Sequence, residues 1–258
     1  MAYKHGVYTS EVPTSVVPAV NTTAGLPVVF GTAPVHLASE RSQSNKPILC
    51  YSYAEAVQQL GYSKDWAKYT LCEVMYSQFA LYNRGPVVFV NVLDPKTHKK
   101  STSSKNVTVT NKVAKVDAPV LLDTLQIKAS TAGSALIDGS DYEAAYDDDG
   151  VLVITLLDDG TATAASNLTL TYDEIDAAAV DADDIIGGIN VSDGSVKGLE
   201  CLNKVFPITS LVPGIVLAPG WSENPTVAAV MKAKAGNINS HFKAITLNDV
   251  PTDAVYKS

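Results

Sequence analysis

The sequence predicts an α/β domain that is interrupted by an inserted β-sandwich or barrel domain. Apolar residues spaced three and four apart from Trp66 to Tyr82 predict a helix, and the apolar run from Val87 to Leu93 predicts a strand buried on both faces. After Pro95 the apolar residues alternate with polar ones, as in half-buried strands. Strand and helix patterns return near the C-terminus. We therefore expect four segments: an extended arm over 1–20, the first part of the α/β domain over 21–95, the inserted β-rich domain over 96–182, and the second part of the α/β domain over 183–258.

The composition is that of a globular protein of 258 residues, which is long enough to bury a sizeable core. The apolar runs are far shorter than a membrane span, and the first residues contain no stretch typical of a signal peptide. We therefore expect a protein that is made and kept in the cytosol and is not inserted in a membrane. The three cysteines, Cys50, Cys72 and Cys201, lie apart in apolar contexts, which favours reduced core thiols over disulfides or a zinc site.

The acidic residues are concentrated in one region of a chain with a formal net charge of −8. Asp138 to Asp193 contains 15 carboxylates and no lysine or arginine, which leaves 12 of the 27 acidic residues and all 19 basic residues for the rest. Outside this region basic residues are in modest surplus over acidic ones, but they form no recognisable basic face with interleaved aromatic residues and no known motif. We therefore expect no nucleic-acid partner.

Residues 1–20 alternate apolar and polar positions around Pro13 and Pro18 and have no helical period. They are interpreted as an extended arm, with a frayed terminus as the alternative. Strands are then expected over Gly25 to Thr32 and over Ile48 to Tyr51.

A first helix is expected over Tyr53 to Leu60, because Ser52 is a typical N-cap and Gly61 a typical C-terminal stop. A second, long helix is expected from Asp65, with one side buried, and Asn83 to Pro86 should end it.

The segment Lys96 to Asn106 is polar, basic and rich in serine, and is expected to be a linker or exposed crossing. Strands are expected around Val107 to Val116 and over Leu125 to Ala129, Val151 to Leu157 and Leu168 to Tyr172. Asp138-Gly139, Asp149-Gly150 and Asp159-Gly160 stand where hairpins would turn.

After residue 183 the pattern predicts a short turn and helix before Val205 to Pro207, and then a strand over Leu211 to Pro219. A helix beginning after Asn224 and a strand over Phe242 to Leu247 complete a βαβ unit. A parallel sheet that gains a strand at residue 247 usually needs further helix to cover it, so we expect a protein shortened at its C-terminus. We also expect the chain to return, after residue 200, to the strand Val87 to Leu93.

Two kinds of chemical site were considered. Clustered aspartates at 138, 141, 147–149 and 158–159 could bind calcium, as in a calcium-dependent β-domain adhesin, but their spacing fails the EF-hand pattern, and surface turns explain them. A hydrolase would need a Ser–His–Asp arrangement, yet there is no GxSxG motif, and nothing selects a triad among His5, His36, His98 and His241. No metal, cofactor or catalytic residue is predicted, and the chain is expected not to be an enzyme.

Several short segments resemble motifs of the tail sheath proteins of contractile phages and of phage-tail-like bacteriocins. Gly6 to Glu11 is similar to the opening "PGVY..E", with His5 in place of the proline, and Phe79 to Val92 is similar to "FF.NGG..V.VVRV". Further matches, each weak alone, occur in the same order as in that family: VVFGTAP within Gly25 to Pro34, "S..E....FG" over Ser52 to Gly61, "L.APG" over Val216 to Gly220, and "..D.P" over Ala244 to Pro251.

The resemblance implies a subtilisin-like α/β sandwich that is not a protease and carries an inserted β-rich domain. It also implies a structural subunit that stacks as hexameric rings around an inner tube and contracts to drive the tube through a target cell envelope. Extended arms would add strands to neighbouring sheets. The inter-subunit arm would be Val7 to Val17, with contacts from Val7, Tyr8, Val12, Val16 and Val17.

The partners implied by the resemblance are other copies of the chain, the inner tail tube protein, and baseplate and tail terminator proteins. Such a protein would be in the bacterial cytoplasm during assembly, and afterwards in the tail sheath of a virion or bacteriocin. Family members continue past the "D.P" strand with more of the α/β domain and a further arm, so the resemblance also implies a C-terminal truncation. A subtilisin-like hydrolase and a calcium-dependent adhesin remain the alternatives at this stage.

Overall fold

The computed structural model describes residues 25–131 and 133–250. A mixed α/β fold with several sheets is observed, in agreement with the coarser prediction of fold class. The largest sheet has five strands in the order β13-β12-β1-β3-β2. Its strands are β1 (Leu26–Gly31), β2 (Ile48–Cys50), β3 (Val87–Asn91), β12 (Pro213–Leu217) and β13 (Ile245–Leu247). β2 runs antiparallel to β3, and the other neighbours are parallel.

The centre of this sheet is mostly apolar because it is covered on both faces. Every residue of β3 is buried, as are all residues of β1 except Pro27. The strand predicted over Val87 to Leu93 is therefore confirmed. Its continuation differs from the prediction, because β12 pairs with β1 and not with β3. β1 already occupies that side of β3, and β2 occupies the other, so no free edge of β3 remains.

Helix α1 (Tyr53–Leu60) is capped as the sequence predicts. The Ser52 hydroxyl accepts a hydrogen bond from the Glu55 N–H, and the Glu55 carboxylate accepts one from the N–H of Tyr51 at 2.8 Å. Gly61 ends the helix at a φ of 72°, where an added Cβ would lie 2.3 Å from the carbonyl oxygen of Pro34. Glycine is required there both by the backbone conformation and by the close approach of another segment.

The prediction of one long amphipathic helix from Asp65 is wrong. Turns precede a short α2 (Thr70–Met75), which continues as the π-helix η2 (Tyr76–Leu81). The wider π turn rotates the remaining side chains relative to a continuous α-helical face. Cys72 and Phe79 are buried, whereas Trp66, in the turns before α2, is 36% exposed and Tyr82, after the π turn, is 68% exposed. Asn83 follows the helix with a φ of 47°, so the predicted stop is correct.

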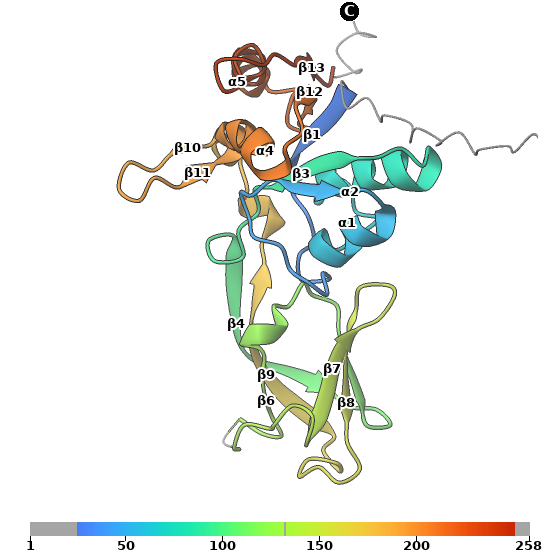
Figure 1. Ribbon diagram of the computed structural model, residues 1–258. Helices are drawn as coiled ribbons and strands as arrows, with labels where there is room; N and C mark the ends of the chain where they lie inside the picture. The colour runs from blue at the N-terminus through green and yellow to red at the C-terminus, as the bar shows by residue number, and fades with distance from the viewer. Residues whose placement is uncertain (1–24, 132, 251–258) are drawn as a thin grey trace, which may run out of the picture.

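The β-rich part folds into two three-stranded sheets in the orders β4-β9-β6 and β5-β8-β7, which lie below the larger sheet in Figure 1. Its strands are β4 (Lys99–Thr108), β5 (Val113–Val116), β6 (Gln126–Lys128), β7 (Tyr142–Tyr146), β8 (Leu152–Leu156) and β9 (Asn167–Ile175). Alternating residues of these strands form a core, with Leu152, Ile154 and Leu170 fully buried. Strand β7 was not predicted.

The predicted linker Lys96 to Asn106 is largely strand β4, which is a correction. Its polar composition disfavours a strand, but β4 lies at a sheet edge, where exposed lysines are common. Pairing with acidic β9 stabilises it further, since Lys99 Nζ lies 2.5 Å from Asp173 Oδ2. Of the three predicted hairpin turns, Asp149-Gly150 joins the paired strands β7 and β8. The other two occur in connections between strands of different sheets.

The returning chain forms α3 (Ala182–Ile186), the short hairpin β10 (Gly188–Ile189) and β11 (Val196–Lys197), α4 (Leu202–Thr209) and α5 (Pro225–Ala235). α5 joins the parallel strands β12 and β13, so the βαβ unit is confirmed. Asn224 caps α5 by accepting from the Thr226 N–H. α4 includes Pro207 and ends at Thr209, beyond the predicted position. Proline has no N–H to donate to the carbonyl one turn earlier, and the helix ends two residues after it.

Two separate hydrophobic cores organise the described residues. One lies around the five-stranded sheet, and the other lies between the two small sheets. We call residues 25–95 and 183–250 the α/β unit and residues 96–182 the β-rich unit. Leu121 and Ile175 of the β-rich unit pack into the core of the α/β unit. Among the helices in the described part of the chain, none has the length and apolarity needed to cross a membrane.

Candidate functional site at the junction of the two units

The two crossings of the chain between the units are tied together at His98. The backbone carbonyl of His98 accepts from the Asp176 N–H at 3.0 Å, which joins the outgoing and returning segments. The His98 ring accepts from the Asp94 N–H at Nδ1, and its Nε2 lies 3.3 Å from Asp184 Oδ2 at the start of α3. Because Nδ1 is an acceptor, the proton of the neutral ring is on Nε2 and points at the Asp184 carboxylate.

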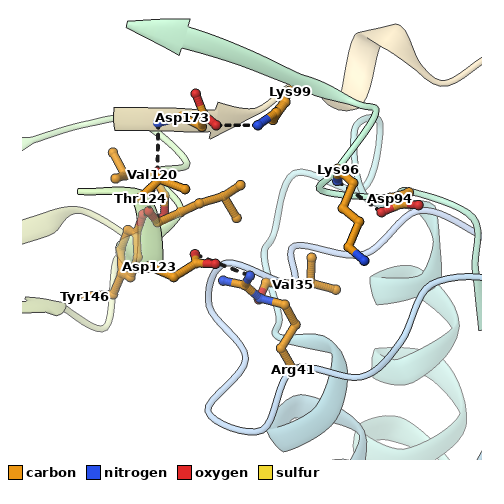
Figure 2. A network of polar contacts seen from close by, with 11 residues as sticks. Val35, Arg41, Asp94, Lys96, Lys99, Val120, Asp123, Thr124, Tyr146 and Asp173 are labelled. Atoms are coloured by element: carbon orange, nitrogen blue, oxygen red, sulfur yellow. Dashed lines mark hydrogen bonds and ion pairs between the residues drawn. The ribbon is translucent and has the colours of Figure 1, made fainter. Parts of the chain in front are cut away.

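A second set of contacts joins the loop after β1 to the β-rich unit (Figure 2). Arg41 donates from Nε to the Val35 carbonyl at 3.3 Å, and its Nη1 lies 3.5 Å from Asp123 Oδ1. The hydroxyl of Tyr146 donates to the carbonyl of Val120 at 2.7 Å. Burial raises the pKa of Tyr146 well above its usual value, so this hydroxyl remains a donor.

His36 is packed between the units, against the rings of Tyr69 and Tyr146 at centroid distances of 6.0 and 5.4 Å. It is 8% exposed, and its Nδ1 is buried without a hydrogen-bond partner among the described residues. Burial, with a smaller effect of the Arg41 guanidinium, lowers the pKa of His36 to about 4. The ring is therefore neutral at pH 7 and acts as an apolar spacer.

Concave surfaces flank the junction on two sides. On one side, two adjoining cavities of about 590 and 350 Å³ share the residues Gln43, Ser44 and Asp94. On the other side, a cleft of about 930 Å³ lies between the units and is lined by residues that include His36, Tyr146 and Glu174. The junction is thus a neck with a hollow on either side.

The residues predicted for the inter-subunit arm, Val7, Tyr8, Val12, Val16 and Val17, lie outside the described residues. Pro251 of the last sheath-like motif does so too, but the preceding Asp249 is well fixed. Its carboxylate accepts from the Gly220 N–H at 2.7 Å and from the Ser222 hydroxyl at 2.9 Å. This aspartate joins the segment after β13 to the loop after β12, which gives the "..D.P" and "L.APG" resemblances a shared structural role.

Two of the aspartates considered for calcium, Asp141 and Asp147, stabilise turns. Asp141 accepts from the N–H groups of Ile137 and Thr161, both at 2.8 Å, and these bonds lower its pKa. Asp147 accepts from the N–H groups of Asp149 and Val151 in the β7–β8 turn. Over 25–131 and 133–250 no group of three or more His, Cys, Asp or Glu side chains is arranged to hold a metal ion.

The described histidines occupy three different environments, since His241 lies against Phe242, away from the pairs formed by His36 and His98. No serine hydroxyl within the described ranges is hydrogen-bonded to any of these rings. The cysteines are free and buried, as predicted, and burial raises the pKa of each thiol to about 12. These thiols are therefore structural.

Sequence reasoning missed the basic residues around the junction, because Arg41, Lys46, Lys197 and Lys204 are far apart in the chain. The sequence feature that could have pointed to this region is the loop 33–47, which is long and polar for a connection within a compact unit.

The chain is similar to a tail sheath protein of Burkholderia phage BcepMu, with 29% identity over 255 residues. The match covers 96% of this chain and 49% of the relative, so the chain spans about half the length of the curated relative. The resemblance to phage tail sheath proteins is thereby confirmed. The relative's name denotes a structural protein and not an enzyme, in agreement with the prediction. No family profile matches the chain.

Among solved structures, the chain is similar to a sheath tail protein from Listeria innocua. The identity is 8%, the TM-score is 0.35, and the match covers 85% of this chain and 47% of the other. A TM-score this low does not show that the two proteins share a fold.

Proposed function

We propose that this chain is part of a structural subunit of a contractile phage tail sheath. The observation that carries the proposal is the similarity to a phage tail sheath protein along nearly the whole chain. The ordered motifs from Gly6 to Pro251 support the same reading.

In this proposal, the α/β unit is a subtilisin-like sandwich and the β-rich unit is inserted into it. The separate cores of the two units and the paired crossings at His98 support an insertion with boundaries near 96 and 182. The four-segment division into 1–20, 21–95, 96–182 and 183–258 is retained as the domain proposal.

The proposed role is mechanical. Subunits stack as hexameric rings around an inner tube, and the sheath contracts and drives the tube through a target cell envelope. Val7, Tyr8, Val12, Val16 and Val17 form an arm that adds a strand to a neighbouring sheet, because main-chain hydrogen bonds can persist while rigid bodies reorient. The partners are other copies of the chain, the tube protein, and baseplate and terminator proteins. The site of assembly is the bacterial cytoplasm, and the final location is the tail.

Antibody labelling tests this proposal. Antibodies raised against the 258-residue chain and carried on gold particles are applied to lysates that contain contractile tails, and the grids are viewed by electron microscopy. Labelling along the whole tail is expected, with pre-immune serum as the control. Labelling restricted to the baseplate, fibres or capsid, or no labelling of any particle, contradicts a sheath role.

A further inference from the structure

A basic groove lies on one side of the junction. The two adjoining cavities described above are lined by cationic side chains from four separate segments: Arg41, Lys46, Lys96, Lys99, Lys197 and Lys204. Figure 2 shows Arg41 in the loop after β1, and Lys96 and Lys99 in the segment that leads into β4. Two acidic residues, Asp94 and Asp123, also line the groove. The groove is therefore cationic overall in a protein whose formal net charge is −8.

Several of these cations are free to bind an external anion. Arg41 is paired with Asp123, and Lys99 with Asp173. Lys46, Lys96, Lys197 and Lys204 form no ion pair with any described residue. Lys46, Lys96 and Lys197 are exposed, and Lys204 is half-buried at the wall. Clustered lysines repel one another, and a complementary negative surface removes that repulsion.

The opposite side of the neck carries the complementary charge. The wall that the β-rich unit contributes to the large cleft contains one cation, Lys100, and the acidic residues Asp117, Asp147, Asp148, Asp149, Glu174 and Asp176. The facing wall adds Lys64, Asp65 and Lys68, so the lining of the cleft is acidic overall. Asp148 and Asp149 form the exposed β7–β8 turn and have no ion pair with described residues. Asp147 braces that turn through its own hydrogen bonds. The turn therefore presents two carboxylates on a fixed backbone.

We propose that the basic groove of one copy binds the acidic β7–β8 turn of a second copy. The inference rests on the proposed function in requiring repeated contacts between copies. A groove and its complement on opposite sides of one chain make a heterologous contact, which closes into a ring or continues as a helix. The occupant is a second copy, because the acidic turn on the other side of the same chain supplies the charge that complements the groove.

Zero-length cross-linking tests which surfaces meet. Carbodiimide joins a lysine amine to a carboxylate only where the two touch. Wild-type chain is mixed at equal amounts in ¹⁴N- and ¹⁵N-labelled forms in low salt, at protein concentrations up to the millimolar range. Mixed-isotope peptides that join Lys46, Lys197 or Lys204 to Asp148 or Asp149 are expected. They should become rarer in high salt, since salt screens exposed charges.

Charge reversal tests the same contact without using the reactive groups. Sedimentation equilibrium is measured for Lys46→Glu/Lys197→Glu, for Asp148→Lys/Asp149→Lys, and for the chain with all four changes. Each pair should weaken self-association about tenfold or more, and the fourfold variant should recover most of it. Lys232→Glu/Lys243→Glu is the matched control, because these lysines are exposed and lie outside both hollows. It should associate like the wild type.

The inference is overturned if the wild type does not associate, if mixed-isotope links join other surfaces, or if the fourfold variant associates no better than the pairs. Binding of an oligonucleotide that the Lys46→Glu/Lys197→Glu change abolishes, without mixed-isotope links, also overturns it. Failure of this inference is distinguishable from failure of the sheath role. If the antibodies label whole tails but the cross-links in those tails lack this pairing, the sheath role remains intact. If mixed-isotope links form but the antibodies do not label tails, the contact is supported and the sheath role is contradicted.

Discussion

Lys99 and Lys100 are consecutive residues whose ammonium groups lie on opposite sides of the β4–β9 pair. Lys99 Nζ lies 2.5 Å from Asp173 Oδ2 on the side of the basic groove, and Lys100 Nζ lies 2.9 Å from Asp176 Oδ2 on the side of the acidic cleft. Alternation along a strand produces this arrangement. The two lysines therefore face different hollows, and each side can be altered by substitutions that leave the other in place.

Asn91 at the end of β3 should be important for stability. Its side chain is 1% exposed, accepts from the N–H groups of Ala33 and Leu93, and donates to the Leu93 carbonyl, each at 3.1 Å. Asn91→Ala leaves these buried groups without partners, and we expect the free energy of unfolding to fall by about 3 kcal/mol. Urea denaturation measures this. Asn237→Ala, at an exposed position, is the control, and equal stabilities of the two variants would refute the role of Asn91.

Tyr146 should contribute through its hydroxyl as well as its ring. Tyr146→Phe keeps the contact with His36 but removes the 2.7 Å bond to the Val120 carbonyl. A loss of about 1 kcal/mol in unfolding free energy is expected, as for a typical buried hydrogen bond. Thermal and urea unfolding give the value. Tyr51→Phe, which alters a 63% exposed ring, should be neutral. No loss in Tyr146→Phe would mean that water replaces the bond at no cost.

The two cores should respond separately to cavities. Ile154→Ala removes a fully buried side chain from the core of the β-rich unit and should cost about 2 to 5 kcal/mol locally. Amide hydrogen exchange should then accelerate in β5, β8 and β9 and change little in β1 and β3. Val216→Ala, in the other core, should show the reverse distribution. Uniform acceleration in both variants would show a single cooperative unit.

His36 should make stability depend on pH between neutrality and about pH 4. Burial lowers its pKa from 6.5 to about 4, so the unfolded chain binds the proton first as the pH falls. The stability conferred by the neutral ring is fully present above pH 6.5 and is lost towards pH 4, by roughly 3 kcal/mol. Urea unfolding at several pH values measures the slope. His36→Leu should flatten it over this range, and an unchanged slope would assign the effect to other groups.

Local signals in the sequence were sufficient for several elements. Ser52, Glu55 and Gly61 define α1 because capping depends on neighbours within one turn. The apolar run of β3 needed no partner to be recognised. The mixed α/β class follows from these local patterns.

Features that depend on distant partners were not predictable in this way. The strand character of Lys99 to Asn106 arises from pairing with β9. The π turn that begins at Tyr76 carries no local signal in the sequence, and its Phe79 packs against Phe89 of β3. The basic groove joins residues from Arg41 to Lys204 that no local pattern connects. The structural role of Asn91 was not predictable for the same reason, since its hydrogen-bond partner Ala33 lies 58 residues away in the chain.

Copy number in purified tails tests the central claim most directly. A subunit of stacked rings must be present in numbers that increase with tail length. Quantitative mass spectrometry of purified contractile tails, with isotope-labelled peptides of this chain as standards, should therefore find it among the most abundant tail proteins. Its absence from the tails, or a handful of copies per tail as for a baseplate or terminator component, would contradict the assignment to the sheath.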